Sequence, residues 1–190
     1  IMHKHLDIIK VSYNEIGKMF KSIEEQSIYD TNYEVYNKNF LLVTVQSEVE
    51  AIKRYGYSAS FLLVKLKDRF ANRVKNLKER NNMLKSMSQL LLRTSRRSDI
   101  VAHYGDGCFA MVMKYTDESG TKQACTRILN MLSSISWRID NEECKLDIQI
   151  VSSMITKKRS AEELISYTLD QLIVTQDDEQ PIFLDEKAEN

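Results

Sequence analysis

Two short apolar segments on either side of a Gly-Asp-Gly tripeptide constrain the fold of this chain more than any other feature. The segments cover residues 99–104 and 108–115, and Gly105, Asp106 and Gly107 lie between them. Glycine and aspartate tolerate the left-handed backbone of a tight turn, so apolar runs of this length around them are typical of a β-hairpin. The sequence therefore predicts two antiparallel strands in the middle of the chain.

The segments around this hairpin alternate between helical and extended patterns. Residues 60–66 form a short apolar run typical of a buried strand. We expect a second strand pair, 137–139 with 146–155 around the turn 140–142, and a last edge strand at 181–184. The predicted helices are 40–55 with Gly56 as C-cap, about 70–93, 120–135, and a final helix from Ser160, where Glu163 completes a capping-box pattern. This order predicts an α/β fold in which helices flank a central mixed sheet.

The first 28 residues carry a different periodicity. Apolar residues recur there with alternating gaps of four and three, at Met2, Leu6, Ile9, Tyr13, Ile16, Phe20 and Ile23. A heptad pattern of this kind predicts a helical stalk that pairs two chains as a coiled coil, and the alternative is an amphipathic helix docked on its own domain. We therefore expect an N-terminal signalling helix over 1–29, a domain over 30–185 and a tail or linker over 186–190.

Charge and cysteine content narrow the function classes. Lys and Arg total 27, as do Asp and Glu, so the formal net charge is zero. This balance argues against general nucleic-acid binding and against anionic membrane surfaces. No apolar run approaches the roughly 20 residues that span a bilayer. Cys108, Cys125 and Cys144 are widely spaced, which favours reduced thiols and a cytoplasmic location.

The predicted hairpin and the residues before it resemble the signature region of GGDEF domains, the diguanylate cyclases. The family pattern is R-x-x-D, five residues, and then G-G-[DE]-E-F; here Arg96, Asp99, Gly105 and Phe109 fall in register. Asp30 through Lys38 resembles the segment with which the family domain begins. Residues 160–164 and 169–172 resemble its final helix. The resemblance implies the nucleotidyl-cyclase-like fold over about residues 30–185.

The chain departs from this family at the positions that the resemblance assigns to catalysis. The second signature glycine is Asp106, and the two acidic positions are Gly107 and Cys108. The aspartate expected at the end of the first strand aligns with Lys65. In working cyclases these carboxylates hold two divalent metals that activate the 3′-hydroxyl of GTP. We therefore expect no catalytic residues, no bound metal, no cofactor and no cyclase activity.

The resemblance also implies a second site, at which the family binds its product. Arg96 and Asp99 match the R-x-x-D inhibition motif, and Arg127 falls where the family often has another arginine for the same ligand. Arginine matches guanine or phosphate acceptors, and a carboxylate accepts from the guanine N–H groups. The alternative is a cluster at a helix terminus, with Asp99 capping a turn.

Two function classes follow from these observations. The first is an inactive regulatory domain that binds cyclic di-GMP through Arg96, Asp99 and Arg127 and relays the signal. The second is a dimerisation or interaction module that binds no nucleotide, as part of a protein with receiver, PAS or EAL domains. In both cases we expect a homodimer through the N-terminal helix, no nucleic-acid partner and no insertion of this segment into a membrane.

Overall fold

Strand β3 (Ala59–Leu66) lies at the centre of the structure, and all its side chains except that of Lys65 are buried. It pairs antiparallel with β5 (Cys108–Lys114) on one side and with β8 (Ile148–Ile155) on the other. A strand that is buried on both faces reads as a continuous apolar run, which is the pattern of residues 60–66. The computed structural model describes residues 28–185 and, ahead of them, 14–16, 18, 19 and 21.

In the part of the chain that the structure describes, the main sheet is mixed and has seven strands in the order β1-β2-β4-β5-β3-β8-β9. Strand β4 pairs antiparallel with β5, whereas β2 with β4 and β8 with β9 run parallel. The remaining strands are β1 (Tyr29–Asp30), β2 (Val35–Tyr36), β4 (Ile100–Gly105) and β9 (Ile182–Leu184). The predicted hairpin and the predicted edge strand are both confirmed.

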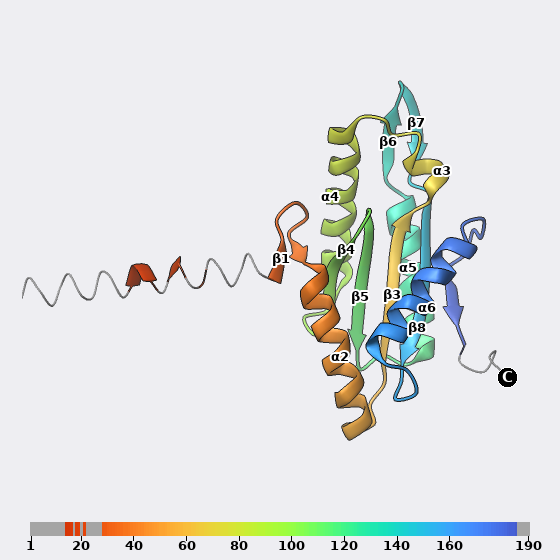
Figure 1. Ribbon diagram of the computed structural model, residues 1–190. Helices are drawn as coiled ribbons and strands as arrows, with labels where there is room; N and C mark the ends of the chain where they lie inside the picture. Colours follow the sequence, from red (N-terminus) through yellow and green to blue (C-terminus); the bar gives the residue numbers. More distant parts are fainter. Residues whose placement is uncertain (1–13, 17, 20, 22–27, 186–190) are drawn as a thin grey trace, which may run out of the picture.

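Helices cover both faces of this sheet (Figure 1). Helices α2 (Lys38–Tyr55) and α6 (Ala161–Val174) pack on one face, and α4 (Leu77–Thr94) and α5 (Glu118–Ser133) pack on the other. Successive strand residues point to opposite faces, so Phe61 and Leu63 join the α2 and α6 layer while Leu62 and Val64 join the α4 and α5 layer. The predicted fold, a central mixed sheet flanked by helices, is confirmed.

The helix ends follow from local capping chemistry. The side chain of Asn37 accepts a hydrogen bond from the backbone N–H of Phe40, and Gly56 ends α2 in the left-handed conformation with φ 71°. Ser160 and Glu163 exchange both hydrogen bonds of the capping box at the start of α6. Both predicted signals are therefore confirmed as the ends of these helices.

The long helix predicted over about 70–93 is wrong in its first part. Asp68–Ala71 forms the short helix α3, and α4 begins only at Leu77. The side chain of Asn76 accepts hydrogen bonds from the backbone N–H groups of Lys78 and Glu79, at 2.9 and 3.3 Å. This N-cap starts a new helix, although the apolar spacing runs through the break.

The predicted pairing of 137–139 with 146–155 is also wrong. Strand β6 (Ser136–Ile139) instead pairs with β7 (Glu142–Lys145) as a separate two-stranded sheet, with Ile139 opposite Glu142. Asp140 and Asn141 both have positive φ, 51° and 65°, which is the geometry of a two-residue hairpin turn. The turn therefore closes immediately after β6, and β8 is left to join the main sheet.

The predicted stalk over 1–29 and the predicted tail over 186–190 lie largely outside the described residues. Of the seam positions, Ile16 is described and is 49% exposed. Among the residues that the structure describes, no helix combines the length and the apolar character needed to cross a membrane.

Candidate functional site

The turn between β4 and β5 holds three consecutive residues with positive φ. Gly105, Asp106 and Gly107 have φ values of 134°, 49° and 70°. A Cβ atom built on Gly107 would lie 3.2 Å from Cδ2 of Leu84, a buried residue of α4. The backbone at Gly107 therefore packs directly against Leu84, and a side chain there would be strained and would have to displace the end of the Leu84 side chain.

Beside this turn, the strand register brings Lys65 opposite Cys108. The ammonium of Lys65 lies 2.9 Å from Oδ1 of Asp68. Burial raises the pKa of the Cys108 thiol to about 12, although the nearby Lys65 acts in the opposite direction. The corner thus contains a cation and a protonated thiol, which are poor partners for a divalent metal ion. In the described part of the chain, no three His, Cys, Asp or Glu side chains come together as a possible metal site.

The segment that follows α6 closes the same corner from the other side. Gln176 accepts from the backbone N–H of Asp68 at 3.0 Å and donates to the Asp68 carboxylate at 3.1 Å. The ammonium of Lys67, which is 2% exposed, donates to the carbonyl of Asp178 at 2.8 Å and lies 3.3 Å from a carboxylate oxygen of Asp147. The Lys67 ammonium and the Asp68 backbone N–H are therefore engaged within the chain.

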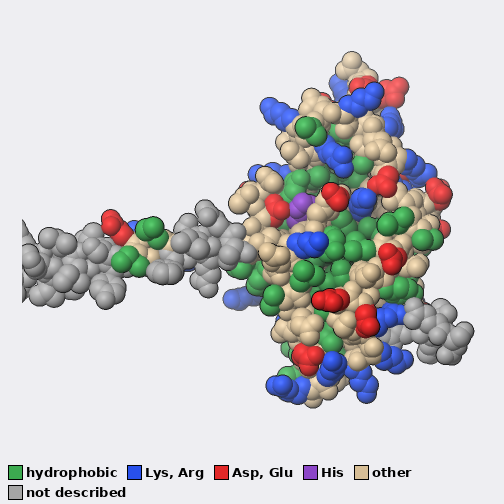
Figure 2. Space-filling model, viewed as in Figure 1, with side chains coloured by type: hydrophobic (Ala, Val, Ile, Leu, Met, Phe, Trp, Pro, Cys, Tyr) green, Lys and Arg blue, Asp and Glu red, His purple; other side chains and the backbone are tan. Residues whose placement is uncertain are grey.

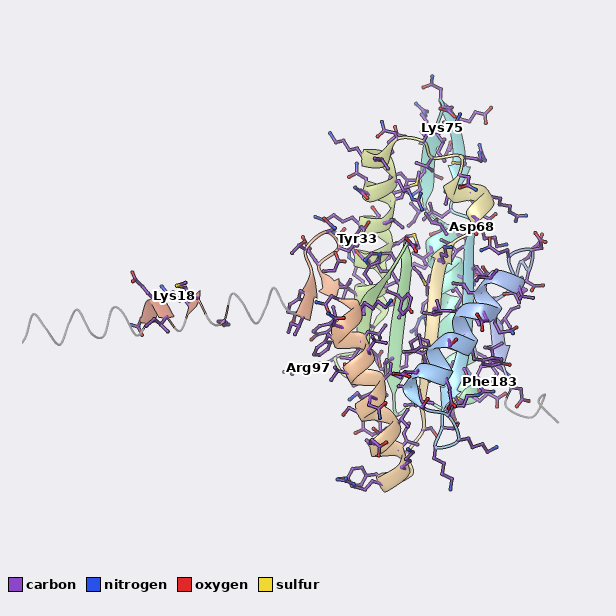
Figure 3. The ribbon with its side chains drawn as sticks, viewed as in Figure 1. Lys18, Tyr33, Asp68, Lys75, Arg97 and Phe183 are labelled. Atoms are coloured by element: carbon purple, nitrogen blue, oxygen red, sulfur yellow. The ribbon has the colours of Figure 1, made fainter. Side chains whose placement is uncertain are left out.

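The R-x-x-D motif lies at the other end of β4, before the strand begins. Figure 3 shows this separation, with Asp68 near one end of the sheet and Arg97 near the other. The Oδ2 atom of Asp99 accepts from the backbone N–H of Arg96 at 2.7 Å, and the Asp99 N–H donates to the Arg96 carbonyl at 3.0 Å. Asp99 therefore closes a tight turn, as the alternative interpretation expects.

The same carboxylate also has an unused acceptor. Its Oδ1 atom is buried and has no hydrogen-bond partner among the described residues. A buried acceptor without a partner costs free energy, roughly 1–3 kcal/mol, unless water or a ligand satisfies it. The Arg96 side chain beside it is exposed. The turn thus holds an oriented carboxylate, one oxygen of which is enclosed, next to an exposed guanidinium.

The structure does not bring Arg96 and Arg127 into one hollow. Arg96 lines a hollow of about 430 Å³ together with Tyr57, Ser58, Tyr115, Thr116, Asp117 and Gly120. Arg127 lines another, of about 740 Å³, which runs along α5 with Lys122, Gln123, Thr126, Asn130 and Met131. The two arginines thus line different hollows, each of which includes residues at α5.

The two tyrosines of the Arg96 hollow were missed from the sequence. Their ring centroids lie 4.8 Å apart. Tyr57 follows the C-cap of α2 and Tyr115 follows β5, so neither belongs to a motif or to a periodic pattern. The sequence therefore carries no signal that marks either ring as part of a site.

His103 joins the hairpin to the first strands of the domain. Its Nδ1 lies 2.8 Å from Oδ2 of Asp30, and its ring packs edge-on against Tyr33, with centroids 4.6 Å apart. The ring also packs against Phe109 at 5.3 Å. This cluster fixes the start of the domain on the signature hairpin, which is a structural role.

The domain has a nucleotidyl-cyclase-like α/β fold. Its sheet order, its two helical layers and the glycine turn between β4 and β5 define this class. The family model described as "Diguanylate cyclase, GGDEF domain" matches residues 27–175. The chain therefore belongs to the GGDEF family. No curated protein sequence matches it.

Three solved structures illustrate the similarity. The coiled coil and GGDEF domain of DgcB from Caulobacter crescentus, in complex with c-di-GMP, aligns with a TM-score of 0.86 at 10% identity, over 96% of this chain and 99% of that one. The diguanylate cyclase SiaD from Pseudomonas aeruginosa, in complex with its activator SiaC, gives 0.77 at 14% identity, over 96% and 72%. The FimX GGDEF domain from the same organism gives 0.72 at 14%, over 82% and 98%. At these identities the matches establish the fold.

Proposed function

We propose that this chain is a catalytically inactive GGDEF domain that binds cyclic di-GMP at Arg96, Asp99 and Arg127 and relays its presence to the rest of the protein. The observation that carries the proposal is the contrast between the two ends of β4. At one end the catalytic carboxylates are replaced by Lys65, Gly107 and Cys108. At the other end the oriented Asp99 carboxylate keeps a buried acceptor, for which the described residues offer no partner, beside an exposed arginine.

Catalytic inactivity rests on electrostatics as well as on missing ligands. A cyclase corner must hold divalent cations, and here the Lys65 ammonium occupies it in an ion pair with Asp68. Incubation with GTP and Mg²⁺ or Mn²⁺ should give no cyclic di-GMP by chromatography. Product above a blank without protein contradicts this part of the proposal.

Ligand binding is supported by the chemistry of the R-x-x-D turn. The Arg96 guanidinium can donate two parallel hydrogen bonds to guanine O6 and N7, and the Asp99 carboxylate can accept from the N1–H and N2–H groups once its enclosed Oδ1 atom turns outward. Arg127 would reach a ligand that extends from the Arg96 hollow along α5, such as a stacked pair of cyclic dinucleotides. The DgcB domain, with the same fold, was solved in complex with c-di-GMP.

Calorimetric titration of a variant series tests this site. A bidentate arginine–guanine contact is worth about 1–3 kcal/mol, so Arg96→Ala should weaken cyclic di-GMP binding at least about tenfold. Asp99→Ala should weaken it as well, because the guanine donors lose their acceptor. Lys65→Ala is the control and should bind normally, since it lies at the opposite end of the sheet. Unchanged binding by Arg96→Ala contradicts the site.

The second candidate function is an interaction module without a nucleotide ligand. Two observations favour it: Asp99 already closes its own turn, and the structure places Arg96 and Arg127 in different hollows. The DgcB match includes a coiled coil, and SiaD was solved with a protein activator. This candidate predicts no heat on titration with cyclic di-GMP.

Under either function we place the domain in the cytoplasm. Cys108 and Cys125 are buried thiols that form no disulfide, which fits a reducing compartment.

A further inference from the structure

The hollow beside Arg96 contains an aromatic surface that neither the R-x-x-D motif nor the signature turn accounts for. Tyr115 is 69% exposed, and its ring lies against that of Tyr57 with an interplanar angle of 40°. The hollow also includes the Asp117 side chain at the start of α5. Its volume of about 430 Å³ falls in the range of small-ligand sites.

The inner tyrosine is held rigidly. Its hydroxyl donates to the carboxylate of Glu48, a residue of α2 that is 2% exposed. Lys114 fixes the same carboxylate from the end of β5, with its ammonium 3.0 Å from Oε2. Burial and the hydrogen bond to Glu48 raise the pKa of Tyr57, so the hydroxyl remains a donor at physiological pH. The ring of Tyr57 is thus a fixed support behind Tyr115.

The outer tyrosine is held in a conformation that its own side chain disfavours. Tyr115 has φ 53°, in the left-handed region where bulky residues are uncommon. Glycine or asparagine would fit this backbone better, yet the chain places a large exposed ring here. Backbone strain of this kind is common at ligand sites. Here the strained Tyr115 is also exposed and lines a hollow together with Arg96.

From this arrangement we infer that Tyr115 is a stacking platform for a guanine base, with Arg96 on one side of the base and the Asp117 carboxylate on the other. Aromatic rings bind bases through their faces, and a carboxylate accepts from the N–H groups that guanine has and adenine lacks. Asp117 uses Oδ1 to cap α5 through the N–H of Gly120 at 2.8 Å, so its second oxygen lies outside the cap. The inference rests on the proposed function, because it assigns one base of cyclic di-GMP to Tyr115 and Asp117 in this hollow and leaves the N–H groups of the other base to Asp99.

Substitution of Tyr115 by asparagine tests the platform without straining the fold, because asparagine tolerates the left-handed backbone. Tyr115→Asn should weaken calorimetric binding of cyclic di-GMP at least about tenfold, or about 1.4 kcal/mol, and keep the wild-type melting temperature or raise it. Tyr115→Phe should bind like wild type. Tyr55→Asn is the matched control, since Tyr55 is equally exposed, at 69%, and lies outside the hollow.

Asp117→Asn tests base selection, because asparagine also caps helices but cannot accept from both guanine donors. The wild-type chain should prefer cyclic di-GMP over cyclic di-AMP, and this variant should lose most of that preference. Wild-type affinity in Tyr115→Asn overturns the inference and leaves the proposed function intact. Binding of GMP that depends on Tyr115, without binding of cyclic di-GMP, supports the platform and overturns the proposed function. A wild-type chain that binds neither compound overturns both.

Discussion

Gly107 shows, at the scale of one residue, why an acidic side chain does not fit easily into the turn between β4 and β5. An acidic residue at this position would adopt φ near 70° and meet the Leu84 side chain within about 3.2 Å. The ammonium of Lys65 would still lie beside the turn, where Lys65 is opposite Cys108 in the sheet and pairs with Asp68. A glycine at this position lets α4 approach the turn, because no side chain lies between the Gly107 backbone and Leu84.

Gly107→Glu should lower the free energy of unfolding by about 1–3 kcal/mol and should restore no cyclase activity. Denaturant unfolding and a GTP turnover assay measure the two effects. Asp106→Gly is the control and should stay within about 0.5 kcal/mol of wild type, because Asp106 is exposed and glycine accepts its φ of 49°. Equal stability of both variants contradicts this account.

The Cys108 thiol gives a pH dependence with a definite sign. Burial raises its pKa from 9.0 to about 12, so the folded chain holds this proton more tightly than the unfolded chain. The stability it contributes is complete below about pH 9 and is lost as the pH rises towards 12. Between pH 8 and about pH 10.5, urea unfolding should show a loss of about 1–2 kcal/mol from this group. Cys108→Ala should flatten that slope, and an unchanged slope contradicts the assignment.

Residue-level prediction from the sequence worked where a motif fixes the register. The positions of Gly105 and Phe109 in the hairpin followed from the family pattern. The relation between Arg96 and Arg127 could not be predicted, because it depends on how α5 packs across the sheet. Tyr115 could not be predicted either, because a left-handed backbone leaves no trace in the local sequence unless glycine or asparagine occupies it.

At the scale of elements, local chemistry predicted the helix ends better than periodicity did. The capping signals at Gly56 and Ser160 gave the C-cap of α2 and the N-cap of α6 as observed. Apolar spacing carried the predicted helix at 70–93 through the break between α3 and α4, because Phe70 and Val74 are buried without being part of one helix. Strand pairing failed at 142–145, where polar strand residues gave no apolar signal.

The start of α6 provides a prediction at this scale. Ser160→Ala removes the side-chain acceptor of the capping box and should destabilise the domain by about 1 kcal/mol. Thermal unfolding measures the change. Ser166→Ala, at an exposed position within the same helix, should have no comparable effect. Equal melting temperatures for the two variants would contradict a stabilising role for the capping box.

At the scale of the whole molecule, the hydrophobic area on one face, the R-x-x-D turn and the heptad residues lie in different places. Figure 2 shows hydrophobic side chains in the middle of one face, between α2 and α6, with charged side chains around them. The R-x-x-D turn lies at one end of the sheet, and the heptad residues precede β1. A ligand at that end and a stalk at the domain's start could together relay a signal, which is the role we propose.

Dimerisation through the heptad seam is the prediction at this scale. Each buried Ile or Phe contributes about 1.5–3 kcal/mol, so several in one seam can hold two chains together. Light scattering should give a dimer for the wild-type chain, and Ile16→Asp combined with Phe20→Asp should give monomers that retain the fold. A wild-type chain that is monomeric at tens of micromolar contradicts the stalk.

Calorimetric titration of the wild-type chain with cyclic di-GMP, with GTP in a parallel titration, tests the central claim most directly. The account predicts saturable binding of cyclic di-GMP, with about two molecules per site if the ligand stacks as a pair, and much weaker binding of GTP in the presence of Mg²⁺. An absence of heat contradicts the sensor. Equal binding of both nucleotides, weakening steeply with salt, would indicate a nonspecific basic surface and would contradict it as well.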